Sequence, residues 1–298
     1  MKDAFPLARL VIYCEYYYAL EGQDVGFDPE IPPLSFSERC RLRLKNTTNL
    51  QSLQIADAAI SPTEWQKSTY PQWAQAKISV IHDGIDLSVY QPPAKPILTL
   101  AANPYRGQIS LKAGDEVLSF VSRNLEPVRG FQMLMRTLPG VLRQRPKAHA
   151  IVVGGNDLSY GHAAPAGLSW KDHLLAEVGD QLDLTRVHFV GKVPYPTYRN
   201  ILAISHVHAY WTTPFVLSWS FLEAALSGLP VVASNTAPVQ EFAPRLGVGT
   251  QGFFDIDGFG QALTSALAKS KRPAPPASLP ELDTKHCVAA QKHLLQTL

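Results

Sequence analysis

The sequence has little cysteine and little charge, and both shortages narrow the classes of protein to which it can belong. Its 298 residues include three cysteines, Cys14, Cys40 and Cys287, which are widely spaced and form no CxxC pair. This spacing indicates neither a disulfide scaffold nor a cysteine-bound metal, so we expect three reduced, buried thiols. Charged residues make up 17% of the chain and the formal net charge is +2, too mild to indicate nucleic-acid binding.

Long hydrophobic runs are also missing. The first apolar run, residues 10–13, is far too short for a signal peptide and is followed by Glu15. No stretch approaches the length of a membrane span. With 46% hydrophobic residues, the chain can still bury one or two cores. These features predict a cytoplasmic protein.

The stretch from Tyr210 to Gly228 has the pattern of a strand, a turn and a helix. An apolar run leads into Ser218-Trp219-Ser220, and a short Ala/Leu-rich helix carrying Glu223 follows. Free backbone N–H groups and the positive helix end would make this turn an anion site. A carboxylate one turn further along suits the paired hydroxyls of a ribose. The stretch predicts a bound nucleotide diphosphate; the alternative is an ordinary βα unit whose acid is solvated.

A second segment places two arginines around one loop. Residues 116–135 read as a strand ending near Arg123, a loop with Glu126-Pro127, then Arg129-Gly130 and a helix. Open α/β sheets bind ligands at the carboxyl ends of their strands, and the planar guanidinium suits phosphate. Two arginines alone are more often a surface pair. Two phosphate-competent βα turns together favour a phosphate site.

The order of elements predicts an α/β fold in two domains. Strands and helices alternate from about residue 97 to residue 271, which is typical of a parallel sheet with helices on both faces. The predicted domains are residues 1–96, 97–271 and, as a linker with a closing helix or a frayed tail, 272–298. The proline-rich runs 91–96 and 269–280 are the predicted linkers. The expected strands are 9–14, 58–60, 77–81, 116–122, 148–153, 187–190, 207–211 and 230–233, and the main expected helices are 36–55, 131–144, 169–177, 195–204, 220–227 and 258–269.

Several short motifs follow one another along residues 123–234. They are Arg123 with Arg129-Gly-Phe131, Val152-Val-Gly-Gly155, Arg186-Val-His-Phe-Val-Gly191, Ser218 with Leu222-Glu-Ala224, Gly228, and Pro230-Val-Val-Ala-Ser234. Together they resemble glycosyltransferase family 4, retaining enzymes of the GT-B fold that use nucleotide-diphosphate sugars. Further segments, at residues 27–30, 61–63, 82–86 and 214–220, resemble a bacterial branch associated with surface polysaccharides. The resemblance covers about residues 1–265.

The resemblance implies transfer of a sugar, with retention, from a nucleotide-diphosphate sugar to a glycan or lipid-linked acceptor. It implies no cofactor and no metal. Catalysis would depend on stabilising negative charge as it grows on the leaving diphosphate. The implied diphosphate-binding, catalytic residues are Arg123 and Arg129; the other implied contacts with the nucleotide sugar are Ser218, Trp219, Ser220, Glu223, Gly191 and Lys192. Glu15 and His82 are weaker candidates to border the cleft.

Two departures from the family pattern affect these expectations. Family members usually carry a further glutamate separated by seven residues from the one that corresponds to Glu223, and that position is Phe215 here. Full-length relatives also begin roughly a hundred residues earlier, so the chain resembles a GT-B protein with a complete C-terminal and an incomplete N-terminal Rossmann-like domain. We therefore expect poor transfer by this form, and self-association or a partner chain covering the incomplete domain. The alternatives are a degenerate, non-catalytic nucleotide-sugar-binding or docking protein, and a GT-B-fold epimerase, for which the necessary acids and histidine are not placed.

Four other features have a plain interpretation beside a functional one. Trp219 suits a sugar face, but an aromatic at a helix start is more often core. His206 and His208 share a strand face, yet no third metal ligand is visible. Asp255 and Asp257 fit a turn better than a metal pair. The basic side formed by Arg39, Arg43 and Lys45 fits a solvated face better than contact with the inner face of an anionic membrane.

Overall fold

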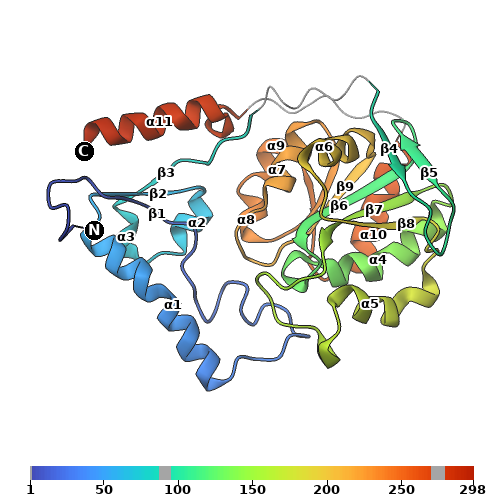
Figure 1. Ribbon diagram of the computed structural model, residues 1–298, viewed down its shortest axis with the longest axis horizontal. Coiled ribbons are helices and arrows are strands. Elements are labelled where there is room, and N and C mark those ends of the chain that lie inside the picture. The colour runs from blue at the N-terminus through green and yellow to red at the C-terminus, as the bar shows by residue number, and fades with distance from the viewer. Residues whose placement is uncertain (1, 87–94, 270–278) are drawn as a thin grey trace. The chain divides into compact units, whose positions relative to one another are not determined.

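The computed structural model describes residues 2–86, 95–269 and 279–298, which group into two compact units (Figure 1). The first contains residues 2–86, 214–216 and 279–298, and the second contains residues 95–213 and 217–269. Most of both predicted linkers lies outside the described residues, so the domain boundaries drawn through them stay a prediction.

The second unit is built on a parallel sheet with strand order β11-β10-β9-β6-β7-β8. The chain moves outward from β6 to β8 and then returns to form β9 on the other side of β6. This reversal places a topological switch point between β6 and β9. The elements are β4 Ile97–Leu100, β5 Ile109–Lys112, β6 Val117–Asn124, α4 Phe131–Gln144, β7 His149–Gly155, α5 Trp170–Val178, β8 Val187–Gly191, α6 Tyr195–Ile204, β9 Val207–Tyr210, α7 Trp219–Leu226, β10 Val231–Ser234, α8 Ala237–Gln240, α9 Ala243–Leu246, β11 Gly249–Gln251 and α10 Ile256–Leu267.

Alternate side chains of the strands pack against helices on opposite faces of the sheet. On one face, the Phe120 ring of β6 lies 6.3 Å from the Phe131 ring of α4. On the other face, Val117 and Ile151 share a core with Ile201 of α6. This arrangement confirms the predicted α/β fold, and α4 and α6 occupy the expected ranges.

An antiparallel hairpin, β4 with β5, was not expected from the sequence. Leu98 and Leu111 on its inner face are buried in the same core as Ile201. Strand β5 alternates apolar and polar residues throughout, which is the period-2 pattern of a half-buried strand, whereas in β4 only residues 98–100 alternate. The hairpin widens the core of the second unit beside α6.

The first unit contains a parallel sheet of order β1-β2-β3. Its core includes Cys14, Leu53 and Tyr70. The closing helix at the C-terminus is present: the N–H of Ile85 donates to Leu282, and the N–H of Thr284 donates to Ile85. The elements are β1 Val11–Tyr13, α1 Phe36–Ile55, β2 Ala58–Ser61, α2 Glu64–Ser68, α3 Gln72–Gln75, β3 Ile78–Val80 and α11 Thr284–Thr297.

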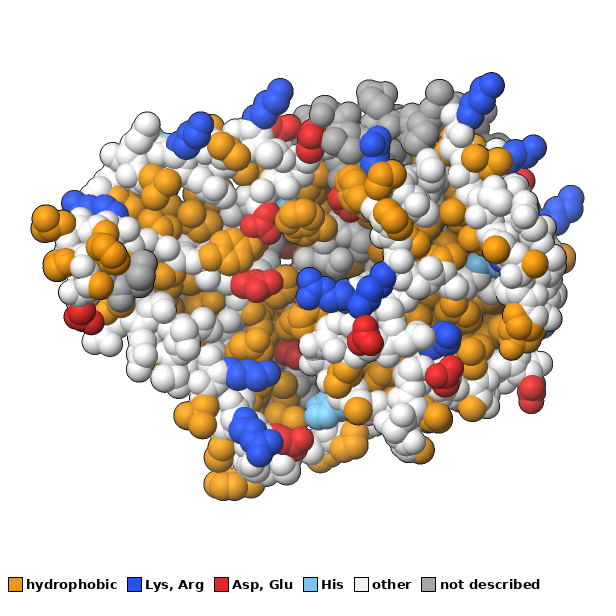
Figure 2. Space-filling view, viewed as in Figure 1, with side chains coloured by type: hydrophobic (Ala, Val, Ile, Leu, Met, Phe, Trp, Pro, Cys, Tyr) orange, Lys and Arg blue, Asp and Glu red, His pale blue; other side chains and the backbone are white. Residues whose placement is uncertain are grey.

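Helix α1 has the predicted range, and its apolar residues differ in exposure. Leu53 is buried, whereas Leu50 and Ile55 are exposed. Figure 2 shows apolar and basic side chains together over the surface that α1 occupies in Figure 1. The three basic residues singled out on this helix, Arg39, Arg43 and Lys45, are all exposed.

The cysteines correct one sequence expectation. Cys14 and Cys287 are buried, as expected, but Cys40 is exposed on α1. All three are free thiols. Among the described residues, no helix combines the length and apolar character needed to cross a membrane.

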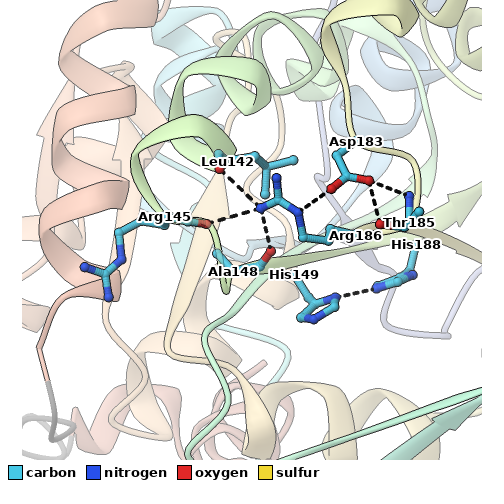
Figure 3. Close-up of polar contacts among 8 residues, drawn as sticks. All are labelled: Leu142, Arg145, Ala148, His149, Asp183, Thr185, Arg186 and His188. Carbon is cyan, nitrogen blue, oxygen red and sulfur yellow. Dashed lines mark hydrogen bonds and ion pairs between the residues drawn. The ribbon is translucent and has the colours of Figure 1, made fainter.

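Arg186 joins the end of α4 to the start of β8. Its Nη1 donates to the carbonyls of Leu142 at 3.2 Å, Arg145 at 3.2 Å and Ala148 at 3.4 Å, and its Nε donates to Asp183 Oδ2 at 2.7 Å (Figure 3). Carbonyls at a helix C-terminus lack partners within the helix. The guanidinium therefore supplies hydrogen-bond donors to the carbonyls at the end of α4 and just after it. Arg186 thus has a structural role in the motif 186–191.

Beside Arg186, two histidines from neighbouring strands stack on each other. His149 Nδ1 lies 3.0 Å from His188 Nε2, and Arg106 Nε donates to His188 Nδ1 at 3.2 Å (Figure 3 shows the histidine pair). Burial, then the charge of Arg106 and the neighbouring His149, lowers the pKa of His188 to about 4. Burial also lowers the pKa of His149. Both rings are therefore neutral near pH 7.

We predict that His188 makes the folded protein acid-sensitive between about pH 6.5 and pH 4. In this window the unfolded chain binds a proton that the folded chain does not, so the free energy of unfolding falls as the pH falls. Urea unfolding of the wild type and His188→Gln should show a stability difference that narrows with acidification. A difference independent of pH would contradict the assignment.

Gly130, between Arg129 and α4, is required by two independent constraints. Its φ is +66°, a left-handed conformation that side chains rarely adopt. A Cβ there would also lie 2.1 Å from Trp211 Cβ, and Trp211 is itself stacked on Phe259. The Arg-Gly pair therefore brings the start of α4 directly against the end of β9.

Replacing Gly130 with Ala should destabilise the protein by about 2–5 kcal/mol, since overpacking adds to the backbone strain. Gly247 is a matched control, because its φ is +65° and nothing lies within 4 Å of its Cβ position. Gly247→Ala should cost only the strain of about 1–2 kcal/mol. Denaturant unfolding of both variants measures the difference; equal losses would show that contact with Trp211 is unimportant.

Candidate functional site

The switch point between β6 and β9 brings Arg129 to the end of β9. Arg129 follows β6 and is only 9% exposed, and its Nη1 donates to Thr212 Oγ1 at 3.0 Å. The N–H of Thr213 donates to the carbonyl of Val128 at 3.0 Å, so the backbones of the two loops are joined as well. Ligands of open α/β sheets bind at such a point.

The two arginines predicted from the sequence meet at one aromatic ring. The guanidinium carbons of Arg123 and Arg129 each lie 5.8 Å from the centre of the Tyr160 ring. Arg123 is exposed, whereas Arg129 is buried. Tyr160 comes from the loop after β7 and was not identified from the sequence. The arrangement concentrates positive charge at the carboxyl edge of the sheet.

Glu126 fixes the loop that carries Tyr160. This side chain is 1% exposed, and its Oε2 accepts from the N–H groups of Ser159 at 3.3 Å, Tyr160 at 3.1 Å and Gly161 at 3.0 Å. Three consecutive N–H groups directed at one oxygen form an anion-binding turn, here filled by an internal carboxylate. The sequence showed Glu126 only as part of a loop and gave no sign of this role.

Glu126→Gln should increase hydrogen exchange at the amides of Ser159, Tyr160 and Gly161 by about fivefold or more. Hydrogen bonds to a charged group are worth about 1.5–3 kcal/mol and neutral ones about 0.5–1.5 kcal/mol. Amide exchange of this loop measures the effect. Glu177→Gln, which removes an ion pair with Arg136 elsewhere, is the control; the same increase in both variants would indicate general loosening.

The turn at Ser218 to Ser220 corrects the expectation of free backbone N–H groups. The N–H of Ser218 donates to the Tyr210 hydroxyl at 2.9 Å, and the N–H of Ser220 donates to Ser218 Oγ at 3.4 Å. An anion at this turn would therefore compete with internal acceptors. Trp219 is 51% exposed, so the interpretation as a core residue is wrong.

Glu223 on α7 faces two tyrosines of α6. Tyr195 donates its hydroxyl to Oε1 at 3.1 Å, and Tyr198 donates to Oε2 at 2.6 Å. Glu223 is 7% exposed, so the carboxylate is held inside the second unit instead of being solvated. Gly191, the last residue of β8, and Lys192, which follows it, complete the predicted set; Lys192 Nζ pairs with Asp157 at 3.0 Å.

A sequence profile described as "Glycosyl transferases group 1" matches residues 115–268, slightly more than half of the chain. The chain belongs to this glycosyl transferase family. A second profile, "Glycosyl transferase family 4 group", matches residues 1–90. The surface-polysaccharide branch suggested by the sequence stays a prediction.

Among known proteins, the chain is similar to the D-inositol 3-phosphate glycosyltransferase of Mycobacterium avium, with 29% identity over 209 residues. The match covers 68% of this chain and 43% of that protein, so the chain spans about two fifths of the relative's length.

Two solved structures show the fold. Sucrose-phosphate synthase from Thermosynechococcus elongatus has a TM-score of 0.59 at 17% identity, covering 89% of this chain and 63% of that one. A UDP-forming α,α-trehalose-phosphate synthase from Burkholderia vietnamiensis has a TM-score of 0.61 at 11% identity. The match covers 99% of this chain and 68% of that one. The fold of this chain is therefore α/β and GT-B-like.

The remaining predicted residues lie in the first unit. Phe215 is buried, with its ring 4.9 Å from that of Tyr16. Glu15 is exposed. His82 is buried, which lowers its pKa, and its Nδ1 accepts from the N–H of Gly84 at 3.1 Å.

The other candidates have structural partners in the second unit. His208 Nδ1 lies 3.0 Å from Ser119 Oγ, and burial lowers the pKa of this histidine to about 3. Asp255 caps α10, accepting from the N–H of Gly258 at 2.8 Å. Within the ranges that the structure describes, no three His, Cys, Asp or Glu side chains form a group able to hold a metal. The expectation that no metal is needed stays a prediction.

Proposed function

We propose that this chain is a retaining glycosyltransferase that transfers a sugar from a nucleotide-diphosphate sugar to a glycan or lipid-linked acceptor. The observation that carries the proposal is the meeting of Arg123 and Arg129 at the switch point of the parallel sheet, beside Thr212. Family membership supports the reaction class. The mild net charge and the proposed ligand give no reason to include nucleic acid or a metal cofactor.

The proposed chemistry depends on charge at the diphosphate. When the bond between the sugar and the β-phosphate breaks, negative charge grows on the leaving diphosphate and the sugar becomes oxocarbenium-like. Fixed cations near the leaving diphosphate stabilise the transition state more than the ground state. Arg123 and Arg129 would supply this charge, with the Ser218–Ser220 turn beside them. Glu223 would accept the ribose hydroxyls, and Gly191 and Lys192 would border the base.

A second candidate is nucleotide-sugar binding without turnover. Phe215 favours it, because a buried aromatic side chain cannot accept the hydrogen bonds that the family's usual glutamate would accept. Release of free sugar or of glycosylated acceptor from a radiolabelled nucleotide sugar separates the two candidates. Binding without either product would support the second.

Arg129→Ala should weaken nucleotide binding about 10- to 150-fold, the equivalent of one hydrogen bond to a charged group, worth about 1.5–3 kcal/mol. Calorimetry with UDP, GDP and ADP should first show one preferred nucleotide. Because Arg129 is buried, Arg123→Ala tests the same charge at an exposed position.

Arg136→Ala is the control for charge, since Arg136 of α4 pairs with Glu177 of α5, away from the proposed site. It should leave the affinity unchanged. Unchanged affinity in both Arg123→Ala and Arg129→Ala would contradict the proposed site.

A further inference from the structure

Glu223 is held by the structure in one orientation. Each of its two carboxylate oxygens accepts a hydrogen bond from a different phenol: Oε1 from Tyr195 at 3.1 Å and Oε2 from Tyr198 at 2.6 Å. A carboxylate anchored through one oxygen can still rotate about its last torsion. Anchoring both oxygens fixes the plane of the carboxylate as well as its position.

The two anchors differ in mobility. Tyr198 is 8% exposed and its bond to Glu223 is short, as expected of a hydrogen bond to an ionised acceptor. Tyr195 is 47% exposed, at the first turn of α6 next to Lys192, and its ring lies 5.7 Å from that of Tyr198. Tyr198 is therefore the rigid inner anchor, and Tyr195 is the outer anchor at the surface.

An ionised carboxylate can accept about four hydrogen bonds in all, two at each oxygen. Vicinal hydroxyls, such as the 2′ and 3′ hydroxyls of a ribose, need a carboxylate held at a fixed angle to donate to it together. Fixing that angle before the ligand arrives reduces the entropy lost on binding.

We propose that Tyr198 and Tyr195 are positioning residues that give the site its preference for ribonucleoside over deoxyribonucleoside diphosphates, acting through Glu223. The inference rests on the proposed function, in which Glu223 accepts the ribose hydroxyls. To the proposed function it adds the residues that position the carboxylate of Glu223. These are two side chains of α6, whereas the glutamate itself is on α7.

The test compares the preferred nucleoside diphosphate with its 2′-deoxy and 3′-deoxy forms by calorimetry on the whole chain. The wild type should bind the ribonucleotide about tenfold or more tightly than at least one deoxy form. Tyr198→Phe should weaken ribonucleotide binding about three- to tenfold and leave binding of that deoxy form unchanged. Tyr195→Phe should do the same to a smaller extent, and Tyr105→Phe, an exposed tyrosine of the same unit, should change neither.

A purely structural role would not produce this pattern. If Tyr198→Phe and Tyr195→Phe weaken both nucleotides equally, or leave the ratio unchanged, the proposal is overturned. If the wild type binds the ribonucleotide and its deoxy forms equally well, Glu223 does not recognise the ribose hydroxyls. This inference then fails, while nucleotide binding stands. If the wild type binds no nucleoside diphosphate, the proposed function fails first.

Discussion

The side chain of Arg129 is a buried cation, and much of the second unit around the candidate site is arranged to accommodate it. Removing a charge from water costs several kcal/mol unless hydrogen bonds replace the lost hydration. Here the guanidinium reaches Thr212 and the face of Tyr160. These partners come from the loops after β9 and β7, while Arg129 itself follows β6, so three strands must be in register at one edge.

That requirement explains several features that look unrelated in the sequence. Gly130 must be glycine because the start of α4 lies against Trp211. The Thr213 N–H pairs with Val128, which holds the ends of β6 and β9 together. Glu126 binds three amides of the next loop and thereby holds Tyr160 near both arginines. Each feature is local, but all contribute to the position of one positive charge.

The sequence predicted the elements better than it predicted the polar contacts between them. Helices α1, α4 and α6 occupy the ranges expected from the sequence, and α1 begins at a capping box formed by Ser35 and Glu38. The hairpin β4–β5 was missed because its strands are short and their pairing is antiparallel in an otherwise parallel unit. The exposure of Leu50 and Ile55 was not predictable from periodicity alone, which indicates a face but not whether anything covers it.

The candidate site shows the same division between what is local and what is not. Arg123, Arg129 and Glu223 could be singled out because their side chains follow strands in a βα pattern. The acceptors of the Ser218 and Ser220 amides could not, because one of them, the Tyr210 hydroxyl, is eight residues away and reaches the turn only in the folded chain. Residue types in a motif therefore indicated which ligand chemistry suits the site. The supporting contacts, Glu126 for Tyr160 and Tyr198 for Glu223, arise from packing between separate elements, and they determine whether those residues are held well enough to use that chemistry.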